Sequence, residues 1–188
     1  DHVKKHYPNS EIKEYKIKPH TTKPICTGTA VGDLVSSGSV KIITSLDKRY
    51  AANDPNNFKP GDILVTDMTD PDWEPVMKIS GGIITNKGGR TCHSAIVARE
   101  LGIPAIVGTD NATQILKDDQ VITMSCSEGE IGYIYPGNLP FTIVETDFSK
   151  IKVPETTLML NIGSPENVFR TSFLPHKGVG LAREEFII

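Results

Sequence analysis

Cysteine is scarce in this sequence of 188 residues, and the three cysteines lie far from one another. They are Cys26, Cys92 and Cys126, and no Cys-x-x-Cys pair occurs. An odd number of widely spaced cysteines argues against a disulfide framework, and the lack of such pairs argues against a zinc site. We therefore expect no metal ion held by this chain and a reducing compartment, the cytoplasm.

Long apolar runs and concentrated charge are missing as well. No stretch approaches the roughly 18–20 apolar residues that a membrane-spanning helix needs, and no signal peptide opens the sequence. The formal net charge is -3, and the basic residues are spread along the chain rather than collected into one run. Neither a nucleic acid nor a membrane is therefore an expected partner.

The two ends of the sequence are unlike natural termini. Residues 1–22 are a polar lead-in of mixed charge, and the chain stops inside the apolar stretch GLAREEFII. We expect a piece of a longer polypeptide, and a short natural protein with a terminal strand is the alternative. The expected organisation is a lead-in over 1–22, a domain over 23–146, a linker over 147–156 and the start of a second domain over 157–188.

Two helices are expected from the residues that begin and end them. Asp70 can cap a helix whose first residue is Pro71, a position at which proline is tolerated. The clearest helix covers residues 92–101, because Gly102 follows it directly and Pro104 lies just beyond.

Short β-branched segments between turn residues predict a sheet. Residues 25–44 are expected to form two strands joined by a turn at Ser36-Ser37-Gly38. A short helical stretch is expected near Pro165–Phe173. Several strands with few helices favour an α/β domain whose helices pack on one side of the sheet. Further strands are expected over 62–66, 81–85, 105–108, 121–126, 129–135, 158–163 and 179–188.

The run IITNKGGRTCHSAIVARELG is expected to form a strand, a turn and a helix. Gly88 and Gly89 permit a sharp turn with exposed N–H groups, and Thr91 can cap the helix. His93 then falls in the first helical turn, beside free N–H groups and the positive end of the helix dipole. Arg90 adds a full positive charge, so a phosphate bonded to the imidazole would lie in a favourable field.

Histidine is chemically suited to carrying a phosphoryl group. An imidazole ordinarily has a pKa of about 6.5, so much of it is neutral and nucleophilic near neutral pH. It is also a good leaving group, whereas a serine or threonine ester would retain the phosphate. On the residues alone, a structural or capping role for His93 is an equal alternative. Cys92 is unsuited as its nucleophilic partner, because adjacent helical side chains point in different directions.

The longer run GGIITNKGGRTCHSAIVARELGIPAIVG closely resembles the phosphohistidine motif of the phosphoenolpyruvate synthases. The wider family includes pyruvate phosphate dikinase and enzyme I of the sugar phosphotransferase system. Its members share a GG-x-T-x-H core, an Ala/Val-rich helix and a G-[IV]-P-A turn. Cys92, where relatives more often have serine, favours the synthase branch, as do the flanking segments VTDMTDPDWEPVMK and SCSEGEIGYIY. The resemblance covers roughly residues 25–136.

This resemblance implies a fold as well as a site. The fold would be an α/β class, swivelling three-layer β/β/α phosphohistidine domain, followed by a truncated piece of a TIM-type barrel. The tail contains a G-x-G-L-x-R-x-E-F pattern and resembles the start of the family's phosphoenolpyruvate/pyruvate-binding barrel. Arg183 matches the arginine that contacts substrate phosphate there, a role to which the guanidinium fork is suited. His93 matches the phosphate carrier.

The resemblance further implies a phosphotransferase that converts ATP, pyruvate and water into phosphoenolpyruvate, AMP and phosphate. Its partners would be an ATP-binding domain and the barrel of the same polypeptide. ATP and Mg²⁺ would serve the full-length enzyme, with neither bound by these 188 residues, which alone are expected to be inactive. Pyruvate phosphate dikinase, another phosphotransferase of the family and a non-catalytic anion-binding fragment are the alternatives.

Thr91 has a second expected role. It matches the threonine that a regulatory kinase/phosphorylase modifies in the synthases. A phosphate there would add about -1.5 to -2 charges beside the carrier and block it by repulsion and bulk. Capping and regulation are compatible, because one hydroxyl can serve both.

Overall fold

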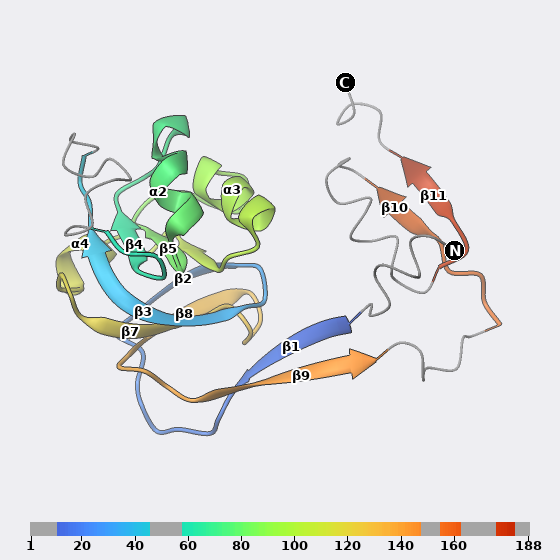
Figure 1. Ribbon diagram of the computed structural model, residues 1–188, viewed down its shortest axis with the longest axis horizontal. Coiled ribbons are helices and arrows are strands. Elements are labelled where there is room, and N and C mark those ends of the chain that lie inside the picture. Colours follow the sequence, from blue (N-terminus) through green and yellow to red (C-terminus); the bar gives the residue numbers. More distant parts are fainter. Residues whose placement is uncertain (1–10, 46–57, 148–154, 163–175, 183–188) are drawn as a thin grey trace. The chain divides into compact units, whose positions relative to one another are not determined.

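The computed structural model describes residues 11–45, 58–147, 155–162 and 176–182 (Figure 1). The chain divides into two compact units, one within Glu14–Ile143 and one built from the flanking segments. No helix in the described part of the chain is long and apolar enough to cross a membrane.

The larger unit is built on a closed barrel with the strand order β2-β6-β5-β4-β3-β7-β8. Its four central strands, β3 to β6, are parallel neighbours, whereas β2, β7 and β8 pair antiparallel with the strands beside them. The carboxyl ends of the parallel strands therefore meet at one rim of the barrel. The strands are β2 (Cys26–Val31), β3 (Val35–Ile42), β4 (Ile63–Thr66), β5 (Gly82–Thr85), β6 (Ala105–Val107), β7 (Val121–Ser125) and β8 (Ile131–Pro136).

Helices follow three of the parallel strands, and α2 and α3 lie beside each other on one side of the barrel (Figure 1). The expected cap is present: the Asp70 carboxylate accepts the N–H of Asp72 at 2.9 Å, and Pro71 begins the first turn. Gly102 ends α3 in the left-handed conformation, with φ of 68°. The helical elements are the 3-10 turn η2 (Pro71–Trp73), α2 (Glu74–Ile79), α3 (His93–Leu101) and α4 (Ala112–Ile115).

The barrel wall separates two apolar cores. Along β4, Leu64 faces the core between the wall and the helices, which includes Trp73 and Ala98. Ile63 and Val65 face the other core, inside the barrel. Burial on both faces explains why β4 and β5 are continuous apolar runs rather than alternating ones.

The turn predicted at Ser36-Ser37-Gly38 is wrong. These residues lie inside β3, paired with β7, and the turn between β2 and β3 comes earlier, at Gly32, where φ is 82°. A Cβ atom on Gly38 would come within 2.5 Å of the Gly61 carbonyl oxygen. Gly38 therefore allows a close backbone approach, which a linear sequence cannot distinguish from a turn.

Two short sheets complete the described residues. β1 (Glu11–Ile17), within the expected lead-in, pairs with β9 (Phe141–Asp147). β10 (Leu160–Ile162) pairs in parallel with β11 (Val179–Ala182). The expected α/β class is thus confirmed, and the closed barrel-like sheet was not predicted from the sequence. The three-layer β/β/α arrangement, the TIM-type barrel and the domain boundaries stay predictions. The helical stretch expected near Pro165–Phe173 lies outside the described residues.

Candidate functional site

His93 is the first residue of α3, which begins one residue after the predicted start, so His93 lies in the first helical turn as expected. The chain reaches it from the carboxyl end of β5 through the turn 86–92. Because β4 runs parallel to β5 with Thr66 opposite Thr85, the loop after β4 begins at the same rim. This parallel pairing brings two loops, distant in sequence, to the imidazole.

The Thr69 hydroxyl contacts the imidazole directly. Its Oγ1 lies 2.9 Å from His93 Nδ1, and Thr69 is 6% exposed. No local spacing in the sequence marks this residue, because the contact spans 24 positions. A buried hydroxyl held at Nδ1 fixes the orientation of the ring and leaves Nε2 as the nitrogen without this contact.

The glycines before His93 adopt the expected sharp turn. Gly88 has a φ of 114°, a backbone conformation that residues with a side chain rarely adopt. A Cβ atom there would come within 2.7 Å of the Cys92 sulfur. Around Gly89, by contrast, a Cβ would meet nothing within 4 Å. Gly88 therefore sets the turn, and Gly89 leaves open space beside the site.

The expected capping role of Thr91 is wrong. The N-cap of α3 is Cys92, in an extended conformation and without a side-chain capping bond, and Thr91 lies exposed one residue earlier. The Cys92 carbonyl accepts the N–H groups of Ala95 and Ile96, at 3.0 and 3.1 Å. Because the first N–H groups of a helix have no partner within the helix, those of His93 and Ser94 remain available to an anion.

Arg90 is present beside the site, but its guanidinium has an ionic partner. Nη2 lies 3.2 Å from Oε1 of Glu130, which precedes β8. The Arg90 carbonyl accepts a bond of 2.8 Å from the Arg99 guanidinium of α3. The structure therefore gathers residues 88–93 at one helix terminus, whereas Arg183 lies outside the described residues.

A polar network supports the rim below these loops. The Asn86 side chain donates to Asp67 at 3.2 Å and to the Thr113 hydroxyl at 2.7 Å, and it accepts the N–H of Thr113 at 3.1 Å. Asp67 also pairs with Lys87 at 2.8 Å. Hydrogen bonds from Lys87 and Asn86 lower the pKa of the Asp67 carboxyl. The loops after β4 and β5 are therefore bonded to each other.

The cysteines are further potential nucleophiles in the described part of the chain. All three are free thiols, and burial raises the pKa of Cys26 and of Cys126 to about 11. Cys92 Sγ lies 3.6 Å from the Ser94 hydroxyl. Among the described residues, no three His, Cys, Asp or Glu side chains are grouped so as to hold a metal ion.

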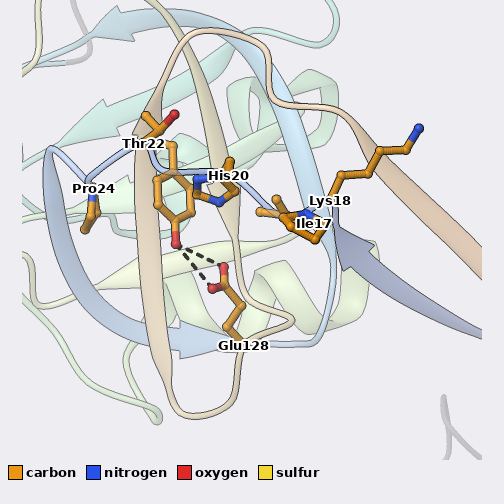
Figure 2. A pocket seen from close by; sticks show the side chains of 8 residues that line it. Ile17, Lys18, His20, Thr22, Pro24 and Glu128 are labelled. Carbon is orange, nitrogen blue, oxygen red and sulfur yellow. Dashed lines mark hydrogen bonds between the residues drawn. The ribbon is translucent and has the colours of Figure 1, made fainter.

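A pocket of about 410 Å³ lies elsewhere on the larger unit (Figure 2). The segment after β1 covers Tyr135 there, with the ring of His20 edge-on to it at 4.7 Å between centroids. Tyr135 donates to the Glu128 carboxylate at 3.2 Å, and burial, together with this carboxylate, raises the pKa of Tyr135 to about 12. Neither His93 nor any residue of its turn lines this pocket.

Known proteins of one enzyme family are similar to this chain. Residues 58–129 match the family model described as the mobile domain of PEP-utilising enzymes. The phosphoenolpyruvate synthase of Aquifex aeolicus is 51% identical over 181 residues, which cover 94% of this chain and 20% of that protein. The synthase of Neisseria meningitidis is 47% identical over 180 residues, which cover 96% of this chain and 22% of that protein. The synthase of Escherichia coli is 48% identical over 166 residues, which cover 88% of this chain and 20% of that protein. The chain spans about a fifth of the length of these relatives.

Proposed function

Because this chain belongs to the PEP-utilising enzymes, whose mobile domain it carries, we propose that His93 takes a phosphoryl group from one site and delivers it to another. The observation that supports this role most directly is the imidazole at the start of α3, with Nδ1 held by Thr69. When Nδ1 carries the proton and its N–H donates a hydrogen bond to the Thr69 hydroxyl oxygen, Nε2 keeps its lone pair. Nε2 is then the attacking nitrogen.

The helix terminus at which His93 lies favours the phosphorylated product. A phosphoryl group at a helix N-terminus meets N–H groups and the positive end of the dipole, which together stabilise an anion by about 0.3–2 kcal/mol. That energy orients the group without trapping it. In our proposal Gly88 sets the turn, Gly89 leaves room for the group, and Arg90 contributes charge.

We extend the proposal to the reaction of the named relatives. The chain would serve a phosphoenolpyruvate synthase that turns ATP, pyruvate and water into phosphoenolpyruvate, AMP and phosphate in the cytoplasm. The described residues do not fit a metal site, so we assign Mg²⁺ and ATP to an ATP-binding domain. Pyruvate is assigned to a barrel of the same polypeptide, where Arg183 would contact its phosphate-bearing form.

Thr91 is proposed as the site of regulation. It is exposed, two residues before the carrier, and its hydroxyl is not the helix cap. A kinase/phosphorylase could therefore modify it without disturbing the start of α3. The added negative charge would repel the phosphoryl donor from His93.

The experiment that tests the carrier role is labelling of the full-length polypeptide. With ATP labelled at the β position, wild-type protein should gain label that is stable in alkali and lost in acid, and His93→Ala should gain none. Label that persists in a folded His93→Ala protein would overturn the proposal. Entry of labelled inorganic phosphate, with release of pyrophosphate, would instead indicate the dikinase reaction.

A further inference from the structure

The ion pair between Arg90 and Glu130 joins the turn before α3 to the residue that precedes β8. Nη2 and Oε1 are 3.2 Å apart, and the two side chains are 50% and 83% exposed. An ion pair so open to water is weak, because solvent screens it and both side chains lose freedom in making it. Arg90 can therefore leave Glu130 for a partner that binds its guanidinium more strongly.

The backbone on both sides of this pair is fixed. The Arg90 carbonyl is held by Arg99 at 2.8 Å, and the N–H of Ala30 in β2 donates to the Glu130 carbonyl at 3.0 Å. The Gly89 carbonyl accepts the N–H of Cys92 at 3.1 Å. Any exchange of partners at this place is thus a movement of two side chains, with the turn and the barrel unchanged.

A phosphoryl group on His93 would be such a partner. It brings two negative charges to the helix terminus, three residues after Arg90. A guanidinium binds phosphate oxygens with two parallel hydrogen bonds, whereas the pair with Glu130 shows one contact. The phosphoryl group and the carboxylate of Glu130 therefore compete for one cation.

We propose that Glu130 is a positioning residue of the carrier: it holds Arg90 while His93 is free and yields it to the phosphoryl group. This inference rests on the proposed function of His93. Breaking the ion pair opposes phosphorylation, so Glu130 keeps the phosphohistidine easier to discharge. Without Glu130, Arg90 has no ion pair to break, and the same phosphoryl donor phosphorylates a larger fraction of His93.

The test uses the full-length polypeptide and transfer from phosphoenolpyruvate. In this step the phosphorus–oxygen bond of phosphoenolpyruvate breaks, a phosphorus–nitrogen bond forms at His93, and the enolate takes up a proton to give pyruvate. The measurement is the ratio of phosphoenolpyruvate to pyruvate at which half of His93 is phosphorylated. Glu130→Gln should lower this ratio by a factor of about 1.4 to 5, the range for an exposed ion pair.

Glu128→Gln is the matched control. Glu128 lies on the same connection between β7 and β8, but its carboxylate accepts from Tyr135 rather than Arg90. Removing this carboxylate changes the net charge by the same amount as Glu130→Gln. It should leave unchanged the midpoint, the ratio of phosphoenolpyruvate to pyruvate at which half of His93 is phosphorylated. The shift in Glu130→Gln should also shrink as salt is raised, because salt screens exposed charges.

An Arg90→Ala background separates competition from a general charge effect. If Glu130 acts through Arg90, Glu130→Gln should not shift the midpoint when Arg90 is absent. An unshifted midpoint in the single variant, or an equal shift in the Arg90→Ala background, would overturn this inference while leaving the carrier role intact. If wild-type His93 gains no phosphate at all, the proposed function itself fails.

Discussion

At the scale of single residues, the site depends on how one imidazole is held. Thr69 is buried, and its hydroxyl oxygen lies 2.9 Å from His93 Nδ1. This contact restrains the imidazole from a flip that would exchange the positions of its two nitrogens. Which nitrogen holds the proton follows from the partner of the other one. In the proposed carrier role, a residue from a different loop thus favours Nε2 as the attacking nitrogen.

A substitution at Thr69 tests this role. Thr69→Val keeps the shape but removes the hydroxyl, and we expect the rate of His93 phosphorylation to fall by about two- to twelvefold, the equivalent of one net hydrogen bond. Thr69→Ser restores the oxygen and should recover most of the rate. Initial rates of labelling in the full-length protein provide the measurement, and a Val variant as fast as wild type would show that Nδ1 needs no partner.

At the scale of elements, the turn before α3 is the decisive piece. It must bring the chain from the end of β5 to the helix while leaving the first N–H groups open. Gly88 makes this possible through its φ of 114° and its closeness to the Cys92 sulfur. Gly108, directly after β6, also lies close to this turn: a Cβ there would be 2.9 Å from the Gly88 carbonyl oxygen.

Two alanine variants separate the glycines of this turn. Gly88→Ala should lower the free energy of unfolding by about 1–3 kcal/mol, because its backbone conformation is unfavourable for alanine and its Cβ clashes with Cys92. Gly89→Ala meets open space and should change it by less than about 0.5 kcal/mol. Denaturant unfolding measures both, and equal effects would mean that the turn tolerates a side chain at either position.

At the scale of the whole larger unit, barrel closure places the site. Ile106 on β6 is fully buried inside the barrel. Gly28 on β2 and Gly132 on β8 make room for it, since a Cβ on either would come within 2.8 Å of the Ile106 side chain. Large and small residues on neighbouring strands thus fill the interior and hold the rim that carries His93.

Truncating this side chain tests the packing. Ile106→Ala leaves a cavity between glycines that cannot fill it, so we expect a loss of about 2–5 kcal/mol in unfolding free energy. Ile131→Ala, at a side chain that is 50% exposed, is the control and should cost about 0.5 kcal/mol or less. A loss at Ile106 no greater than at Ile131 would contradict the packed interior.

The sequence by itself determined the local parts of this protein. The cap at Asp70, the end of α3 at Gly102 and the place of His93 at the start of that helix were all predicted and are confirmed. Each depends on residues within a few positions of one another, where backbone preference and capping act directly. The family resemblance was readable for the same reason, since its motif is one continuous run.

Only the tertiary structure decided which distant residues meet at the rim of the barrel. The contact of Thr69 with His93 and the pairing of Arg90 with Glu130 join residues 24 and 40 positions apart. The strand through Gly38 likewise depends on the close approach of Gly61. No local preference encodes these contacts; they arise because parallel strands end at a common rim and the sheet closes on itself.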